Sequence, residues 1–261
     1  MTRMKDKVVV VTGSSTGIGQ AASIKFAEEG ADVVITYHSS RDGTEETLKA
    51  IEATGRKGLA VQTDVADVES IKNLIRMAYE TFGHIDVLVN NAVVRNLALL
   101  HEVSDNLWNN SMETNLRSIF VATKEVAPIM MKQGGGSIIN VSSMHGIRPS
   151  DNRRAGYASS KGGMIALTRS LATELSPNGI YVNGLILGSI PTGGSAATKV
   201  TATDANALHS AADAYETQFV PVRRRGRLSE SSECLIFLSN ASEAFMTGES
   251  IVCDGGWTII D

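Results

Sequence analysis

Short runs of β-branched and aliphatic residues alternate with longer amphipathic segments along the whole chain. The short runs are apolar on both faces, as the interior strands of a parallel sheet are. Between them, apolar residues recur every three to four positions, which predicts crossover helices. The predicted strands are Val8–Thr12, Asp32–Tyr37, Gly58–Thr63, Val87–Asn90, Ser137–Ser142, Ile180–Ile186 and Ser250–Cys253. The predicted helices are Ile18–Glu29, Gly43–Thr54, Val68–Phe82, Asp105–Gln133, Tyr157–Leu175 and Ser229–Asn240.

This alternation predicts an α/β protein with a Rossmann-type, doubly wound fold: a seven-stranded parallel sheet with helices on both faces. No internal repeat and no linker rich in Pro or Ser divides the sequence, so we expect a single domain over residues 1–261. One stretch, 191–220, departs from the alternation and is rich in Gly, Ala, Thr and Ser. A connection of this length is expected to be a substrate loop or lid, or equally a pair of ordinary surface helices.

Composition excludes several classes of protein. The 261 residues carry 24 Lys and Arg against 28 Asp and Glu, a formal net charge of −4, which argues against a nucleic-acid partner. The two cysteines, Cys234 and Cys253, lack CxxC spacing and are expected to be small buried apolar residues, with no metal site. No apolar run reaches the roughly 18 residues of a membrane span, and residues 1–7 lack the apolar stretch of a signal peptide. We therefore expect a soluble, cytoplasmic protein with no membrane partner.

A glycine-rich turn, Thr-Gly-Ser-Ser-Thr-Gly-Ile-Gly over residues 12–19, joins the first predicted strand to the first helix. In this context Gly13 permits a tight turn, Gly17 lets a diphosphate approach the backbone, and Gly19 allows close packing of helix on strand. The N-terminus of the helix offers free N–H groups and the positive end of a dipole. The strand–turn–helix setting therefore predicts a dinucleotide site.

The end of the second predicted strand indicates which dinucleotide is bound. An acidic residue there would hold the ribose 2′-hydroxyl of NAD, but the segment reads Ile-Thr-Tyr-His-Ser-Ser-Arg over residues 35–41, without a carboxylate. Ser39 and Arg41 can donate hydrogen bonds to a 2′-phosphate. NADP is therefore the preferred cofactor and NAD the alternative, while Arg41 could also be a solvated loop residue.

Tyr157 and Lys161 are four residues apart at the start of a predicted helix, so both project from one face. A phenol has a pKa near 10, and a neighbouring ammonium lowers that pKa so that the phenol can exchange a proton near neutral pH. Such a pair by itself is common on helices. Its surroundings favour chemistry, because Ser143 and Asn91 follow strands at the edge of the sheet where ligands bind, and Asn115 is polar within an apolar helix.

Together these residues resemble the short-chain dehydrogenase/reductase family in its single-domain form, over essentially the whole chain. The matching residues are Thr12 to Gly19, Asp64, Asn90-Asn91-Ala92, Asn115, Ser143, Tyr157 with Lys161, Asn183 to Thr192, Thr247-Gly248 and Asp254-Gly255-Gly256. The stretches around Ser143 and Tyr157 look most like bacterial glucose 1-dehydrogenases. The resemblance implies an NAD(P)-dependent oxidoreductase that transfers hydride between the nicotinamide and a secondary alcohol or carbonyl of the ketone, sugar or steroid class.

The resemblance also implies a role for each site residue. Tyr157 would be the general acid and base, and Ser143 would hydrogen-bond the substrate oxygen. Lys161 would hold the nicotinamide ribose and lower the pKa of Tyr157, and Asn115 would position a water in a proton relay. The implied cofactor contacts are Gly13, Ser15, Gly17, Ile18, Gly19, Ser39, Arg41, Asp64, Val65, Asn91, Tyr157, Lys161, Ile190 and Thr192. The substrate contacts are Val93, Ser143, His145 and Leu187.

The chain departs from the family pattern at three places. Val93 stands where Gly usually follows Asn-Asn-Ala, and Leu187 replaces the Pro of a Pro-Gly pair after the sixth strand. Ser143 precedes Tyr157 by one residue more than in many members. We expect the extra residue in the loop before Tyr157, and Ser142 is the substitute if Ser143 is displaced.

Two alternative functions are compatible with the same residues. An NADP-sensing regulatory protein would need no proton donor, and a non-redox dehydratase or epimerase would use the same scaffold.

Three arginines precede Tyr157, namely Arg148, Arg153 and Arg154, and they either bind an anionic substrate or are solvated or interface residues. The helices predicted over residues 105–133 and 157–175 are apolar around more of their circumference than a monomer requires, so we expect a homotetramer, with a dimer second.

Overall fold

The computed structural model describes residues 2–148, 153–192 and 217–260. Within them, seven parallel strands form one sheet in the order β3-β2-β1-β4-β5-β6-β7. The strands are β1 (Val8–Val11), β2 (Asp32–Tyr37), β3 (Gly58–Gln62), β4 (Val87–Asn90), β5 (Gly136–Ser143), β6 (Ile180–Leu187) and β7 (Ser250–Cys253). All seven predicted strands are confirmed. The strand order reverses between β1 and β4, which opens a crevice at their C-terminal ends.

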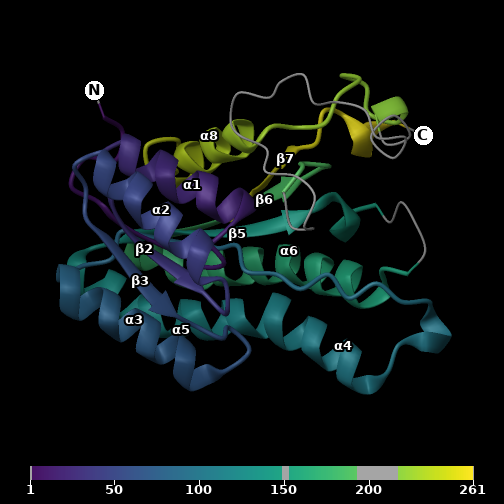
Figure 1. The fold of residues 1–261 in the computed structure, drawn as a ribbon, viewed down its shortest axis with the longest axis horizontal. Helices are drawn as coiled ribbons and strands as arrows, with labels where there is room; N and C mark the ends of the chain where they lie inside the picture. The colour runs from purple at the N-terminus through teal and green to yellow at the C-terminus, as the bar shows by residue number, and fades with distance from the viewer. Residues whose placement is uncertain (1, 149–152, 193–216, 261) are drawn as a thin grey trace.

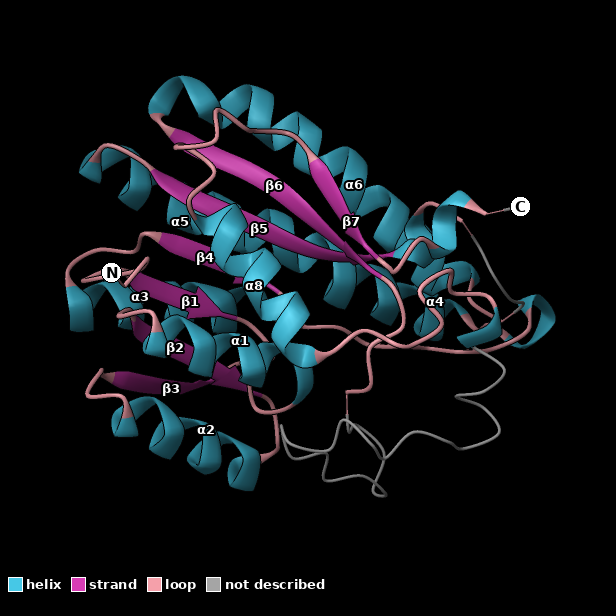
Figure 2. Ribbon diagram, turned by 90° about the horizontal axis from the view of Figure 1, so that it is seen from above, coloured by secondary structure: helices cyan, strands magenta, loops and turns pink. Residues whose placement is uncertain are grey.

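Helices cover both faces of the sheet (Figures 1 and 2), as predicted. α1, α2 and α8 lie on one face, and α3, α5 and α6 lie on the other. The helices are α1 (Gly17–Glu28), α2 (Arg41–Ala53), α3 (Val68–Phe82), α4 (Asp105–Met112), α5 (Ser118–Gln133), α6 (Ala155–Leu175) and α8 (Leu228–Ser239). α3 and α5 end at Gly83 and Gly134, whose φ angles of 81° and 93° are left-handed.

The core consists of two layers, because successive strand side chains point to opposite faces of the sheet. On the face of α1 and α8, Val9 packs in a cluster with Phe26 and Leu235. On the other face, Val10 packs in a cluster with Leu74 and Val126. The sequence of β1 is therefore apolar throughout because both faces are covered.

One predicted helix is interrupted. The helix expected over residues 105–133 comprises α4, a π-helical turn over Glu113–Arg117 (η2) and α5. Hydrophobic periodicity alone does not reveal a π turn, because the helical path continues through it. Four short 3₁₀ turns complete the described elements: η1 (Leu100–Glu102), η3 (Met144–Gly146), η4 (Ser176–Asn178) and η5 (Trp257–Ile259).

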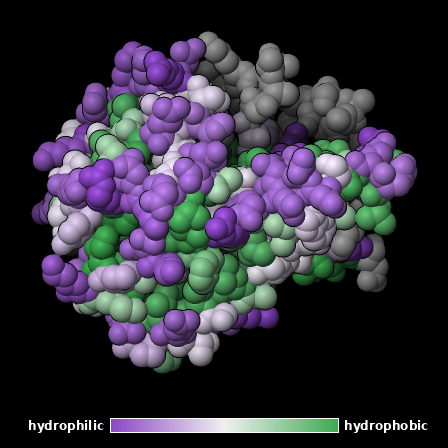
Figure 3. All heavy atoms as spheres, turned by 90° about the horizontal axis from the view of Figure 1, so that it is seen from below, coloured by the Kyte–Doolittle hydropathy of each residue, from purple (hydrophilic) through white to green (hydrophobic). Residues whose placement is uncertain are grey.

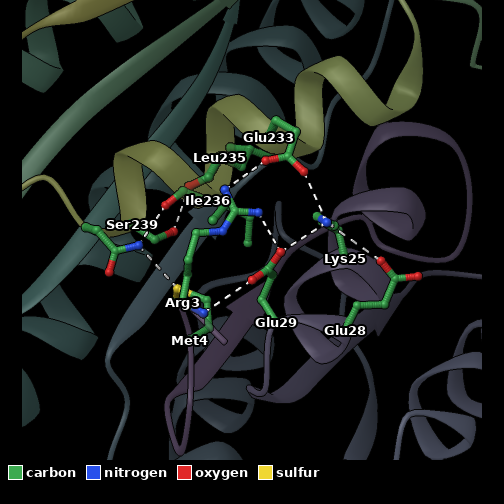
Figure 4. Close-up of polar contacts among 10 residues, drawn as sticks. Arg3, Met4, Lys25, Glu28, Glu29, Glu233, Leu235, Ile236 and Ser239 are labelled. Atoms are coloured by element: carbon green, nitrogen blue, oxygen red, sulfur yellow. Dashed lines mark hydrogen bonds and ion pairs between the residues drawn. The ribbon is translucent and has the colours of Figure 1, made fainter. Parts of the chain in front are cut away.

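A cluster of charges fastens the N-terminal segment to two helices (Figure 4). Arg3 donates to Glu29 at the end of α1 at 2.5 Å and to Glu233 of α8 at 2.8 Å. Lys25 of α1 lies 3.1 Å from both carboxylates. The four side chains therefore bridge segments more than 200 residues apart in the chain.

Three further expectations concern the lid segment, the two cysteines and membrane spans. Most of the predicted lid segment, namely residues 193–216, lies outside the described residues. Cys234 and Cys253 are free thiols, half-buried against the core cluster on the α8 side of the sheet. Among the described residues, no helix has the length and apolar character needed to cross a membrane.

Candidate active site

The glycine-rich turn follows β1 directly and is packed from several sides. Gly13 and Gly17 have φ angles of 64° and 59°, which favour glycine. A Cβ on Gly13 would lie 2.8 Å from the Cα of Ala92, and one on Gly17 would lie 3.1 Å from Thr192. A Cβ on Gly19 would collide with the carbonyl oxygen of Gly13. Gly19 therefore lets the turn fold onto itself, which differs from the predicted packing of helix on strand.

Hydrogen bonds from the end of β4 hold this turn in place. The side-chain amide of Asn91 donates to the carbonyl oxygens of Thr12 and Gly13, both at 2.9 Å. The hydroxyl oxygen of Thr12 accepts from the backbone N–H groups of Asn91 at 2.9 Å and of Ala92 at 3.0 Å. The Asn91 amide, expected to contact the cofactor, thus directs its donors at the turn. Asn91 positions that turn at the switch point between β1 and β4.

A cleft of about 880 Å³ opens along the C-terminal ends of the strands. It brings together nine of the predicted cofactor and substrate contacts: Gly13, Ser15, Gly17, Ile18, Asp64, Val65, Asn91, Val93 and Thr192. Ser39 and Arg41 are exposed at the start of α2 and are not among its lining residues. Ile190 is buried and is not among the lining residues either. The lining residues that the sequence analysis did not predict include Tyr37, His38, Arg95, Asn110 and Thr114, which lie outside the family motifs.

The cleft suits a dinucleotide. The N-cap residue of α1, Thr16, makes no side-chain cap hydrogen bond, so the first turn of the helix presents uncapped N–H groups beside the glycine turn. Gly17 and Ile18 of that turn line the cleft. At the end of β2, the hydroxyl oxygen of Thr36 accepts from the N–H of Gly13 at 2.8 Å. The described residues thus present free backbone N–H donors at the start of α1, and the side chain at position 36 is not acidic.

Tyr157 and Lys161 lie in the first turns of α6, one turn apart and almost completely buried, with exposures of 5% and 3%. The ammonium nitrogen of Lys161 lies 6.0 Å from the centre of the Tyr157 ring and donates to the carbonyl oxygen of Val141 at 2.6 Å. Burial, and after it the positive charge of Arg95, lower the pKa of Lys161 to about 7. The pair therefore combines a phenol with a cation that is costly to keep charged.

The two serines at the end of β5 have different partners. The hydroxyl of Ser142 donates to the carbonyl oxygen of Lys161 at 3.0 Å, which ties α6 to β5. Ser143 is the last residue of β5, and its hydroxyl oxygen accepts from the N–H of His145 at 3.4 Å. The imidazole of His145 packs edge-on to the Tyr157 ring, with centres 6.0 Å apart. Ser143 therefore keeps its place at the strand end despite the longer spacing to Tyr157.

Asn115 lies in the π turn, fully buried, and joins three parts of the site. Its side-chain oxygen accepts from the N–H of Val94 at 2.8 Å, and its amide donates to the carbonyl oxygen of Val94 at 3.0 Å. The same amide donates to the hydroxyl of Ser160 at 3.1 Å, and that hydroxyl donates to the carbonyl oxygen of Tyr157 at 2.7 Å. Asn115 thus connects the segment after β4 with the helix that carries Tyr157.

The other departures from the family pattern are accommodated locally. Val93 is 40% exposed and lines the cleft. Leu187 ends β6 as a buried residue, and the next position requires glycine because a Cβ on Gly188 would lie 2.7 Å from the Cα of Asp254. Arg148 donates to the carbonyl oxygen of Trp257 at 3.4 Å, and the arginines before Tyr157 are not among the residues that line the cleft.

Comparisons with known proteins agree with this architecture. The family model for short chain dehydrogenases matches residues 7–203. A 3-oxoacyl-(acyl-carrier-protein) reductase, FabG, of Staphylococcus epidermidis is 32% identical over 251 residues, 96% of this chain and 98% of that protein. An uncharacterized oxidoreductase of Bacillus subtilis, YxbG, is 36% identical over 257 residues, 98% of this chain and 92% of that protein.

Solved structures are similar over the same extent. A short-chain dehydrogenase/reductase from Serratia marcescens superposes with a TM-score of 0.88 at 32% identity, covering 98% of this chain and 99% of the other. A short-chain type dehydrogenase/reductase from Mycobacterium marinum gives a TM-score of 0.87 at 27% identity, covering 98% and 97%. This chain therefore belongs to the short-chain dehydrogenase/reductase family. It is an oxidoreductase of the class that uses NAD(P), with a small-molecule substrate.

Proposed function

We propose that this enzyme interconverts a secondary alcohol and its carbonyl, with Tyr157 as the general acid and base. The observation that carries the proposal is the buried Tyr157–Lys161 pair on α6, next to the end of β5, where His145 packs edge-on to the Tyr157 ring and donates its backbone N–H to Ser143. Tyr157, Lys161 and Ser143 are not among the residues that line the cleft. The name of the Staphylococcus relative, a reductase of 3-oxoacyl groups, supports the reduction of a ketone. Sugars and steroids are the other two substrate classes that we propose to test.

Each residue has a defined task in this proposal. In reduction, the Tyr157 hydroxyl donates its proton to the carbonyl oxygen, and in oxidation the phenolate takes it back. Lys161 would stabilise the phenolate by its charge, because its ammonium lies 6.0 Å from the centre of the Tyr157 ring in a buried setting where Coulomb interactions are strong. Ser143 donates a hydrogen bond to the substrate oxygen as charge develops there. Asn115 holds the segment after β4 against α6 and keeps this group of residues together.

The proposed cofactor is NADP, which when bound supplies or accepts the hydride. Gly13, Ser15, Gly17 and Ile18 would hold its diphosphate at the uncapped end of α1. The absence of an acidic side chain at position 36 supports NADP over NAD, since a carboxylate there would repel a 2′-phosphate. Ser39 and Arg41 would reach this phosphate from the start of α2. A higher kcat/KM with NADH than with NADPH would contradict this choice.

Tyr157→Phe tests the central assignment. Removing the hydroxyl eliminates the proton donor and leaves the ring packing, so kcat should fall by about 10²–10⁴-fold while the Kd of NADPH stays within about twofold. The measurement is NADPH oxidation with a panel of ketones, sugars and steroids, together with NADPH binding by fluorescence. Tyr181→Phe is the matched control, because Tyr181 lies at the opposite, N-terminal end of the sheet in β6.

The same assay separates the alternative functions. Unchanged turnover by Tyr157→Phe would refute the role of Tyr157. A sensing protein would bind NADPH and turn over nothing in the panel. A dehydratase or epimerase would form product with no net change in absorbance of the reduced nicotinamide.

We also propose a homotetramer, with a dimer as the second choice. Figure 3 views the molecule from the side on which α3, α4 and α5 lie in Figure 1, and apolar side chains gather among polar ones on that face. Trp108 of α4 and Phe120 and Met131 of α5 are exposed large apolar residues. A monomeric mass in solution, measured by light scattering, would contradict both assemblies.

A further inference from the structure

Arg95 is a cation that lines the cleft. It follows β4 by five residues, is exposed, and lines the cleft together with Asn110 and Thr114. Within the part of the chain that the structure describes, its guanidinium makes no hydrogen bond and no ion pair. By contrast, Arg225, which also lines the cleft, donates to the hydroxyl of Ser189 at 2.9 Å. Arg95 thus offers its donors to whatever enters the cleft.

Positive charge predominates in the part of the cleft around Arg95. Arg95 is close enough to the buried Lys161 for its charge to disfavour the lysine ammonium, so two cations act on one region. Among the described lining residues, Asp64 is the only carboxylate. Asp64 follows β3, whereas Arg95 follows β4, and three strand spacings of about 4.8 Å separate these strands in the sheet. The carboxylate therefore does not neutralise Arg95, and the region attracts anions.

We propose that Arg95 binds an anionic group of the substrate, so that this enzyme prefers carbonyl compounds that carry a carboxylate or a phosphate over their neutral analogues. The inference rests on the proposed carbonyl chemistry and specifies its substrate class. A guanidinium pairs with the two oxygens of a carboxylate or phosphate through parallel, charge-assisted hydrogen bonds. A neutral ester occupies the same space and forms no such pair.

The position of Arg95 favours the substrate over the cofactor. The phosphates of a dinucleotide have a cradle at Gly13, Gly17 and the start of α1, across the switch point from the β4 segment. Arg95 instead lies two residues beyond Val93, on the segment that Asn115 ties to the helix of Tyr157. The charge of Arg95 acts on Lys161, which lies one helical turn from the proton donor, so an anion held by Arg95 would lie near the catalytic pair. Arg95 would then orient the carbonyl as well as attract the acid.

The test compares matched acids and esters. The pairs are pyruvate with methyl pyruvate, acetoacetate with methyl acetoacetate, and levulinate with methyl levulinate, which place the carboxylate progressively further from the carbonyl. Dihydroxyacetone phosphate with dihydroxyacetone forms the phosphate arm. We measure kcat/KM with NADPH for the wild type, Arg95→Gln and Arg95→Lys. Arg76→Gln is the charge-matched control, because Arg76 lies outside the cleft on α3 and pairs with Glu80.

For at least one pair, we expect the wild type to prefer the anion and Arg95→Gln to lose about 10- to 100-fold in kcat/KM for it, with the neutral partner changed less than about twofold. Arg95→Lys should keep part of the preference, and Arg76→Gln all of it. No preference for any anion, or an equal loss for both members of the pair, would overturn the inference. A raised Kd for NADP⁺ in Arg95→Gln would also overturn it, by assigning Arg95 to the cofactor.

A binding measurement keeps this inference separate from the proposed chemistry. Levulinate and dihydroxyacetone phosphate are titrated calorimetrically into the wild type and Arg95→Gln, each saturated with NADP⁺, where no reduction can occur. Binding to the wild type that weakens at least about tenfold in Arg95→Gln supports the anion site even if no carbonyl is reduced. Absent binding to the wild type, or equal binding to both proteins, refutes the anion site even if neutral ketones are reduced.

Discussion

Lys161 illustrates at the scale of one residue how burial creates reactivity. Its ammonium lies in the interior with one carbonyl oxygen as its hydrogen-bond acceptor, and Arg95 adds repulsion. A cation in this setting binds its proton weakly, so it gains from a neighbouring negative charge such as the Tyr157 phenolate. The buried position that the proposed chemistry requires of Lys161 therefore lowers the free energy of unfolding as long as the lysine is charged.

Lys161→Met should remove this cost. The pKa of Lys161 is about 7 in the folded protein and 10.5 in the unfolded chain, so between these pH values the unfolded chain binds more protons. The contribution of Lys161 to the free energy of unfolding therefore rises with pH across this window, by at most ~1.4 kcal/mol per pH unit. The stability advantage of Lys161→Met should be largest at pH 6 and shrink towards pH 9. Urea unfolding of both proteins at pH 6, 7.5 and 9 measures it, and a constant difference would contradict the assignment.

At the scale of elements, the π turn between α4 and α5 decides how the site is assembled. It carries Asn115, whose hydrogen bonds reach the segment after β4 and the helix of Tyr157. Periodicity predicted a helix across this region because apolar positions continue through it. The interruption itself depends on backbone partners in other segments, which a pattern within one segment does not contain.

Asn115→Leu should show how much this junction contributes. The substitution keeps the approximate shape and leaves the part-buried N–H and C=O of Val94 and the buried hydroxyl of Ser160 without their side-chain partner, so the free energy of unfolding should fall by about 1–3 kcal/mol and kcat should fall with it. Thr123→Val in α5 is the matched control, because the buried Thr123 hydroxyl has no hydrogen-bond partner among the described residues. Its loss should leave stability unchanged or improved. Equal effects of the two variants in urea unfolding would disprove the argument.

At the scale of the whole molecule, charges near the N-terminus connect distant segments (Figure 4). Glu29 is the central acceptor and is 14% exposed, compared with 49% for Glu233. Arg3, and after it Lys25, lower the pKa of Glu29 to about 2. Because the pKa of this carboxyl is 4.5 in the unfolded chain, its stabilisation is present above pH 4.5 and is lost as the pH falls towards 2.

Glu29→Gln should therefore lower the free energy of unfolding by about 1 kcal/mol at pH 7, and the difference should shrink as the pH is lowered from 4.5 to 3. Glu80→Gln is the control, because Glu80 pairs with Arg76 on the surface of a single helix with both side chains 58% exposed. That variant should differ little from the wild type at any pH. A loss for Glu29→Gln that is as large at pH 3 as at pH 7 would contradict the ionic origin of the effect.

The features that depend on local spacing could be predicted from the amino-acid sequence. Alternating apolar runs predicted the seven strands, the glycine turn predicted a dinucleotide cleft, and the four-residue spacing of Tyr157 and Lys161 predicted their shared face. These follow from the periods of strands and helices, which neighbouring residues alone establish. Only the tertiary structure placed Arg95 in the cleft, gave Asn115 its partners and directed Asn91 at the turn. Those contacts join segments that meet only when the sheet forms, and no spacing along the chain encodes them.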